Sequence, residues 1–110
     1  MRKVTDQITD AFINGHKLSV GNSRTDGVTL YLHDNAIAWR DDDGLYISMA
    51  GWPTVTTRER LNGLLAKIAP KYHVVQRQGR QLLINDDLKL QIPLIMKHAD
   101  ISYKVKEWGV

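Results

Sequence analysis

The sequence predicts a small α+β domain, in which a three-stranded antiparallel meander, a C-terminal hairpin and extra strands pack against two short helices. Hydrophobic residues recur at helical spacing in two segments and alternate with a period of two in the segments between and after them. The length of 110 residues suits one domain, 1–110, that buries a core without cross-links. There is no cysteine, which excludes disulfides and zinc–thiolate sites and fits a reducing cytosol.

The first expected element is a helix in the segment VTDQITDAFING, residues 4–15. Its hydrophobic residues fall on one helical face, at Val4, Ile8, Ala11 and Phe12. Asn14-Gly15 predicts the end of this helix, because glycine adopts the left-handed conformation that closes a helix. A short strand at 17–21 is expected next, and the segment NSRTDG at 22–27 has the composition of a turn.

Residues 28–50 predict an antiparallel meander of three strands, each with one buried face. The alternation gives three sets of residues that each share a face: Val28, Leu30 and Leu32, then Ile37 and Trp39, then Leu45, Ile47 and Met49. Turns are expected at Asp34-Asn35, whose residue types tolerate positive φ, and at 42–44.

The second helix is expected over residues 56–69, with a leucine-rich stripe on the sheet and Pro70 at its end. The stripe comprises Leu61, Leu64, Leu65 and Ile68. Thr56 and Glu59 match a capping box, in which each side chain accepts a hydrogen bond from the backbone amide of the other residue. This pattern gives the threonines before the helix a structural role.

Three patterns predict strands after the second helix. YHVVQRQGRQLLI reads as a hairpin around Gln78-Gly79. The segment 88–92 places Leu88, Leu90 and Ile92 on one side of a strand. The alternation of ISYKVKEW predicts a last strand that begins at Ile101.

Basic residues are concentrated in the second half of the chain. Residues 1–55 contain five Lys/Arg against seven Asp, whereas residues 56–110 contain ten Lys/Arg against five acids. The basic segment, residues 58–80, holds six Lys/Arg and one acid: Arg58, Arg60, Lys67, Lys71, Arg77 and Arg80, with Glu59. Such a segment could attract phosphate or an acidic protein. It could equally be the solvated basic face of a small domain.

Trp52 lies in the loop before the second helix, next to a glycine. We expect it to plug the end of the core, with contact to a partner as the alternative. Helical position places Arg58 and Asn62 near each other, off the leucine stripe, and Arg60 on the solvent side.

Motifs of catalytic or cofactor-binding sites are missing from the sequence. It has no phosphate-binding loop, no dinucleotide-binding glycine pattern and no nucleophile elbow. The four histidines form no i, i+4 pair, and the consecutive aspartates 41–43 lack the alternating oxygens of a calcium loop. We therefore expect no enzyme activity, no cofactor and no metal site. Without a signal-peptide pattern or a long apolar run, we expect a soluble intracellular protein that makes no membrane contact.

Three stretches of the chain resemble a group of small bacteriophage-encoded proteins of unknown function. AFINGHKLSVGNSRTDG, LYLHDNAIAWR and LYISMAGWPTVTTRERLN follow the order of that group's motifs N-T-x-T-D-G, L-H-G-N-x-I-A and A-G-W-x-T-x-T-T-R-E-R-L-N. The resemblance spans residues 11–65, and its most specific motif is carried by residues 50–62. Ser23 stands where the group has threonine, and Asp34 where it has glycine. Residues 85–110 depart from the pattern and are expected to be a family-atypical extension.

The resemblance implies a phage origin, the cytoplasm of the host cell as location, and no catalytic activity. We therefore expect a small accessory protein that binds a host protein, and inhibition of a host enzyme or defence system is one form that this binding could take. The candidate partner-binding residues are Trp52, Arg58, Arg60, Asn62, Lys67, Arg77 and Arg80. The alternative is a nucleic-acid-binding module that uses the basic segment 58–80, with Tyr72 and His73 available for stacking.

Overall fold

The structure of the chain, a computed structural model, describes residues 3–52, 54–96, 99–100 and 102–106. The helices are α1 (Lys3–Ile13) and α2 (Val55–Ile68). The strands are β1 (Leu18–Val20), β2 (Ser23–Thr25), β3 (Thr29–Leu32), β4 (Asn35–Arg40), β5 (Leu45–Ile47), β6 (Tyr72–Arg77), β7 (Arg80–Asn85), β8 (Leu90–Pro93), β9 (Ile95–Met96), β10 (Ala99–Asp100) and β11 (Tyr103–Lys106). Neither described helix is long and apolar enough to cross a membrane.

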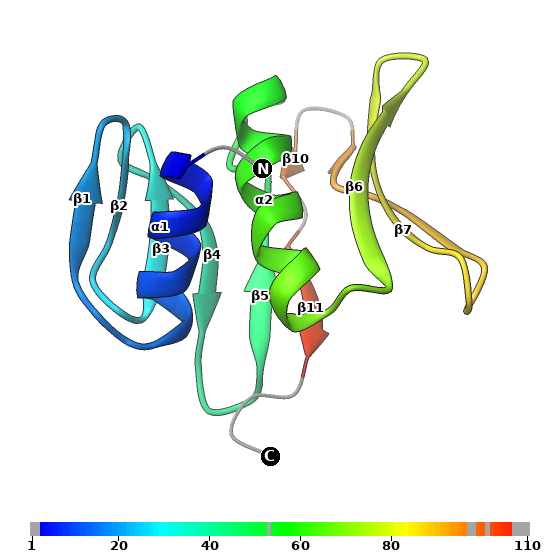
Figure 1. Cartoon of the computed structure of the whole chain (residues 1–110). Helices are drawn as coiled ribbons and strands as arrows, with labels where there is room; N and C mark the ends of the chain where they lie inside the picture. The colour runs from blue at the N-terminus through cyan, green and yellow to red at the C-terminus, as the bar shows by residue number, and fades with distance from the viewer. Residues whose placement is uncertain (1–2, 53, 97–98, 101, 107–110) are drawn as a thin grey trace.

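The main sheet has six antiparallel strands in the order β1-β2-β3-β4-β5-β11. Both helices lie on one face of it, and a second sheet, β6-β7-β8, stands beside α2 (Figure 1). The α+β class and the meander β3-β4-β5 that the sequence predicts are therefore confirmed. The last strand, β11, pairs with β5, so the end of the described chain completes the main sheet.

The core lies between the main sheet and the two helices. Ile8 and Phe12 of α1 and Leu61, Leu64 and Leu65 of α2 are fully buried, which confirms both predicted apolar faces. The core also takes in residues of the second sheet and the segments after it: Val74, Leu83, Leu94 and Val105. Helix α1 ends at a turn in which Gly15 has φ of +73°, and the Phe12 carbonyl accepts from the Gly15 amide at 3.2 Å and from the Arg40 guanidinium at 3.0 Å.

Two turns lie elsewhere than the sequence predicted. Ser23–Thr25, expected in a turn, form β2 between β1 and β3. In the first meander turn, His33 and Asp34 take the left-handed φ values of 50° and 64°, while Asn35 already begins β4. The patterns show that a turn is present, but the pairing of the neighbouring strands decides which residues belong to it.

A β-bulge reverses the expected alternation in β4. The pairs Leu30↔Ala38 and Tyr31↔Ala36 leave one extra residue, Ile37, on β4. Ile37 and Ala38 are consequently both buried, and Trp39 is only partly buried on the opposite face. The prediction that Ile37 and Trp39 share a face is wrong.

The predicted capping box is also wrong. Helix α2 begins at Val55, and its N-cap is Thr54, whose hydroxyl accepts from the Thr57 amide at 3.2 Å. Threonines at positions 54, 56 and 57 can all act as caps, and the first of them is used. Glu59 instead accepts a hydrogen bond from the Thr5 hydroxyl of α1, at 2.9 Å.

The hairpin around Gln78-Gly79 is confirmed as β6–β7. Strand β8 begins only at Leu90, because Leu88 lies in the preceding turn with 62% of its surface exposed. Strand β11 confirms the last predicted strand from Tyr103 onward, whereas Ile101 lies outside the described residues.

Candidate partner-binding surface

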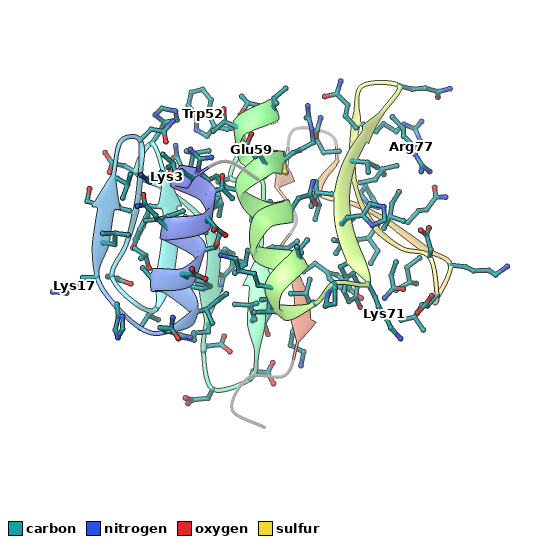
Figure 2. The ribbon with its side chains drawn as sticks, viewed as in Figure 1. Lys3, Lys17, Trp52, Glu59, Lys71 and Arg77 are labelled. Carbon is teal, nitrogen blue, oxygen red and sulfur yellow. The ribbon has the colours of Figure 1, made fainter. Side chains whose placement is uncertain are left out.

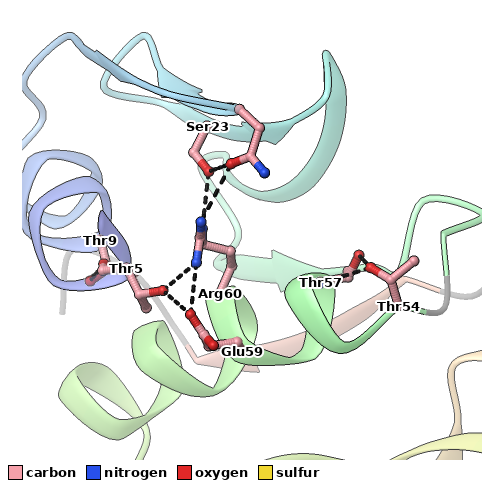
Figure 3. A network of polar contacts seen from close by, with 8 residues as sticks. Thr5, Thr9, Ser23, Thr54, Thr57, Glu59 and Arg60 are labelled. Carbon is pink, nitrogen blue, oxygen red and sulfur yellow. Dashed lines mark hydrogen bonds and ion pairs between the residues drawn. The ribbon is translucent and has the colours of Figure 1, made fainter. Parts of the chain in front are cut away.

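Arg60 is buried at the junction of α1, α2 and β2, with 6% of its surface exposed. Its guanidinium donates to the Ser23 hydroxyl at 3.0 Å, to the Thr5 hydroxyl at 2.5 Å and to Glu59 at 2.9 Å (Figure 3). The prediction of a solvent-facing Arg60 is wrong. Position 60 follows Thr57 by three residues and precedes Leu64 by four, and both of those side chains are buried on the same side of α2.

Asn62 and Lys67 also hold the fold together. The Asn62 side-chain amide pairs with the backbone of Val74: Nδ2 donates to the carbonyl at 2.9 Å, and Oδ1 accepts from the amide at 2.7 Å. The Lys67 ammonium forms ion pairs with Asp6 at 2.9 Å and Asp10 at 2.8 Å, both on α1. Asn62 thus joins α2 to the second sheet, and Lys67 joins α2 to α1.

Arg58 and Lys71 are attached to the second sheet. One guanidinium nitrogen of Arg58 donates to the side-chain carbonyls of Gln76 at 3.0 Å and Gln81 at 2.8 Å. Lys71 pairs with Asp87 at 3.0 Å on the surface. Arg58 remains partly exposed, so it is held in position and still reaches solvent.

Arg77 and Arg80 lie at the tip of the β6–β7 hairpin, directly opposite each other and exposed. Like charges in such a cross-strand pair repel, which costs up to about 1 kcal/mol when no acid intervenes. These two arginines and Arg58 are the candidate arginines that offer a guanidinium to a partner.

Trp52 does not plug the core, because 52% of its surface is exposed. Ala50 and Gly51 before it both have left-handed φ, 53° and 78°, and the Trp52 amide closes the turn onto the Met49 carbonyl at 2.9 Å. Val55, the first residue of α2, is 67% exposed. We call Trp52, Val55 and Arg58 the helix-start surface. Figure 2 shows Trp52 beside the start of α2 and Arg77 toward the same end of the molecule.

An alanine in the left-handed region costs about 1 kcal/mol or more, and such backbone strain is concentrated at functional sites. Here the strained turn directs a tryptophan away from the core. It therefore supports the alternative interpretation of Trp52, in which this side chain contacts a partner.

A second exposed surface is not among the sequence-based predictions. Cross-strand pairing aligns Arg24 with Tyr31, and Trp39 with Tyr46, on the face of the main sheet opposite the helices. The Arg24 guanidinium carbon lies 3.9 Å from the centre of the Tyr31 ring, and the Trp39 and Tyr46 rings stack with centroids 6.0 Å apart. We call these four residues the outer aromatic row. The period-two alternation of β3 and β5 could have predicted Tyr31 and Tyr46 on this face. It fails for Trp39, because the bulge in β4 shifts the alternation by one residue.

Both ends of the outer aromatic row carry ion pairs. Arg24 pairs with Asp34 at 3.0 Å, and Lys104, opposite Tyr46, lies 3.5 Å from Asp43. The Tyr46 hydroxyl donates to Asp43 at 2.8 Å. This hydrogen bond, with help from the Lys104 charge, lowers the pKa of Asp43 below its ordinary value. The same hydrogen bond raises the pKa of Tyr46.

The comparisons with known proteins give one match. The family model described as "Kyanoviridae Gp96 protein" matches residues 1–103, well beyond the stretch 11–65 that carries the motif resemblance. No curated protein and no solved structure matches the chain.

Proposed function

The chain belongs to the Kyanoviridae Gp96 protein family, and from this premise we propose that it is a bacteriophage protein that acts by binding a host protein, without catalysis, in the host cytoplasm. Inhibition of a host enzyme or defence system is the effect that we expect of such binding. The observation that carries the proposal is the exposed Trp52, held outward by a strained turn at the start of a capped helix.

The helix-start surface has the composition of an interface centre. Tryptophan and arginine are enriched among the residues that dominate binding energy. Trp52 and Val55 supply exposed apolar surface, and Arg58, three residues after Val55 on α2, is held in position by Gln76 and Gln81. Because the N-cap and the glutamine contacts already order this region, a partner would lose little conformational entropy by binding to it.

The contacts of the basic segment do not favour the nucleic-acid alternative. Arg60 and Lys67 are directed into the fold, and Lys71 has an acidic neighbour. Nonspecific affinity for nucleic acid depends on the number of phosphates that cations can neutralise. The six cations of the segment therefore do not act together on one exposed surface.

The test is affinity capture from the host with the tagged full chain, followed by measurement of Kd with the purified captured protein. We expect Trp52→Ala to weaken binding at least about tenfold, the scale of an interface hot spot, without lowering Tm. Leu88→Ala is the matched control, because Leu88 is also exposed but lies in the turn before β8. It should change Kd less than about twofold.

Two results would reject the proposal. One is a captured set that is the same for the wild type and for Trp52→Ala. The other is micromolar binding to single-stranded RNA or duplex DNA at physiological salt that falls steeply with added salt, since that dependence marks phosphate contacts.

A further inference from the structure

We propose that the outer face of the main sheet binds a second copy of this chain, so that the protein forms a symmetric face-to-face dimer through the outer aromatic row. This inference rests on a different surface from the helix-start surface and does not depend on the proposed function. Its premises are the uncovered aromatic residues and the arrangement of charges around them.

The outer face carries three aromatic side chains and is uncovered in the described part of the chain. Both helices lie on the other face, and the second sheet packs on α2 (Figure 1). Tyr31, Trp39 and Tyr46 occupy three successive strands and all remain partly exposed. Aromatic residues in such numbers are typical of the desolvated centre of a protein interface.

The charges on this face argue against a polyanionic ligand. Arg24 and Lys104, cations that the structure describes on this face, each have an acid within 3.5 Å or less. Asp41 and Asp42 are exposed in the same turn as Asp43. A nucleic-acid backbone would meet these carboxylates at the edge of the aromatic row, where they would repel its phosphates. A protein surface with both signs of charge fits better.

Each end of the row carries charges of both signs, Arg24 and Asp34 at one end and Asp43 and Lys104 at the other, so the two ends can pair with each other across an interface. Arg24 lies on β2 near the β3–β4 turn, whereas Asp43 lies in the β4–β5 turn, at the other end of the strands. A two-fold axis in the plane of the interface, perpendicular to the line from Arg24 to Asp43, brings each Arg24 against Asp43 of the second copy. The same operation places the aromatic centres against each other, as an isologous interface requires.

The first experiment measures the mass of the full chain in solution by sedimentation equilibrium over a wide concentration range. We expect the mass to rise from 12.5 kDa toward twice that value. Trp39→Ser should stay monomeric at concentrations where the wild type is mostly dimeric. Trp52→Ser, which removes an exposed tryptophan from a different surface, should associate like the wild type.

The second experiment exchanges charges and does not depend on how Trp39→Ser folds. Arg24→Asp and Asp43→Arg each place like charges together and should each weaken the dimer at least about tenfold. In the double variant Arg24→Asp/Asp43→Arg the opposite charges meet again, so most of the lost affinity should return. Circular dichroism and Tm serve as checks that each variant is folded.

Four results would overturn the inference. The wild type could remain at 12.5 kDa at the highest concentration. Trp39→Ser could associate like the wild type. The double charge variant could also lose as much dimer affinity as the two single variants lose together. Quenching of tryptophan fluorescence by oligo(dT) in the wild type but not in Trp39→Ser, with both monomeric, would assign the outer face to single-stranded nucleic acid instead.

Discussion

Arg60 and Arg77 belong to the same basic segment, yet the fold places them in opposite environments. Arg60 is buried and bonded to residues of α1, β2 and α2 itself, whereas Arg77 is exposed at a hairpin tip opposite another arginine. A run of positive charge along the chain is therefore not a positive patch on the surface. On a helix, a long cationic side chain lies on the same face as the residues three and four positions away. When that face is buried, the charged group contacts a polar site inside the fold instead of solvent.

Leu65→Ala sets the scale for this comparison. Leu65 is fully buried in α2, and its truncation should lower the free energy of unfolding by about 2–5 kcal/mol through lost burial and the cavity left behind. Urea denaturation followed by circular dichroism measures this value. A loss below about 0.5 kcal/mol, the range of surface substitutions, would contradict the packing of α2 on the sheet.

Arg60→Met should cost nearly as much, about 3 kcal/mol, because it removes the buried guanidinium that contacts the Thr5 and Ser23 hydroxyls and the Glu59 carboxylate. Methionine keeps much of the apolar stem, so the loss reports on the polar contacts. The same denaturation experiment checks it. A change near zero would mean that the network around Arg60 contributes nothing to stability.

The N-cap distinguishes two neighbouring threonines. Thr54→Ala should lower the free energy of unfolding by about 1 kcal/mol, because the Thr57 amide loses its acceptor. Thr56 is the second residue of α2, and Thr56→Ala should change the free energy of unfolding by less than about 0.5 kcal/mol. If the two losses were reversed, the helix would begin at the position that the capping-box pattern predicts.

Lys67→Met tests a cation of intermediate exposure. Its ion pairs with Asp6 and Asp10 are partly exposed, and pairs of that kind contribute about 0.2–1 kcal/mol. We expect a loss in this range that shrinks as salt is added, because ions screen exposed charges. Thermal melts at two salt concentrations measure it, and a loss independent of salt would assign the effect to packing of the side chain.

Arg77→Gln should have the smallest effect, within about 0.5 kcal/mol and in the stabilising direction, because it removes a like-charge pair across the hairpin. A melt of this variant beside Arg80→Gln provides the measurement. Clear destabilisation by either change would show that the hairpin arginines, like Arg60, have structural partners.

The fold class, the two amphipathic helices, the meander and the β6–β7 hairpin could all be predicted from the residues alone. These features follow from periodicity and from turn residues such as Gln78-Gly79, which are local properties of the chain. The absence of cysteine and the phage resemblance were also evident from the residues alone.

Which polar residues face inward depends on how the elements pack together. Arg60 contacts Ser23 and Thr5, which lie 37 and 55 residues away in sequence, and Lys67 contacts Asp10, 57 residues away, so no local pattern records these contacts. The same holds for the bulge that turned Trp39 to the outer face, since register depends on how β4 pairs with β3. Periodicity reports what one segment prefers, whereas a functional surface is formed by side chains that remain exposed after all segments have packed.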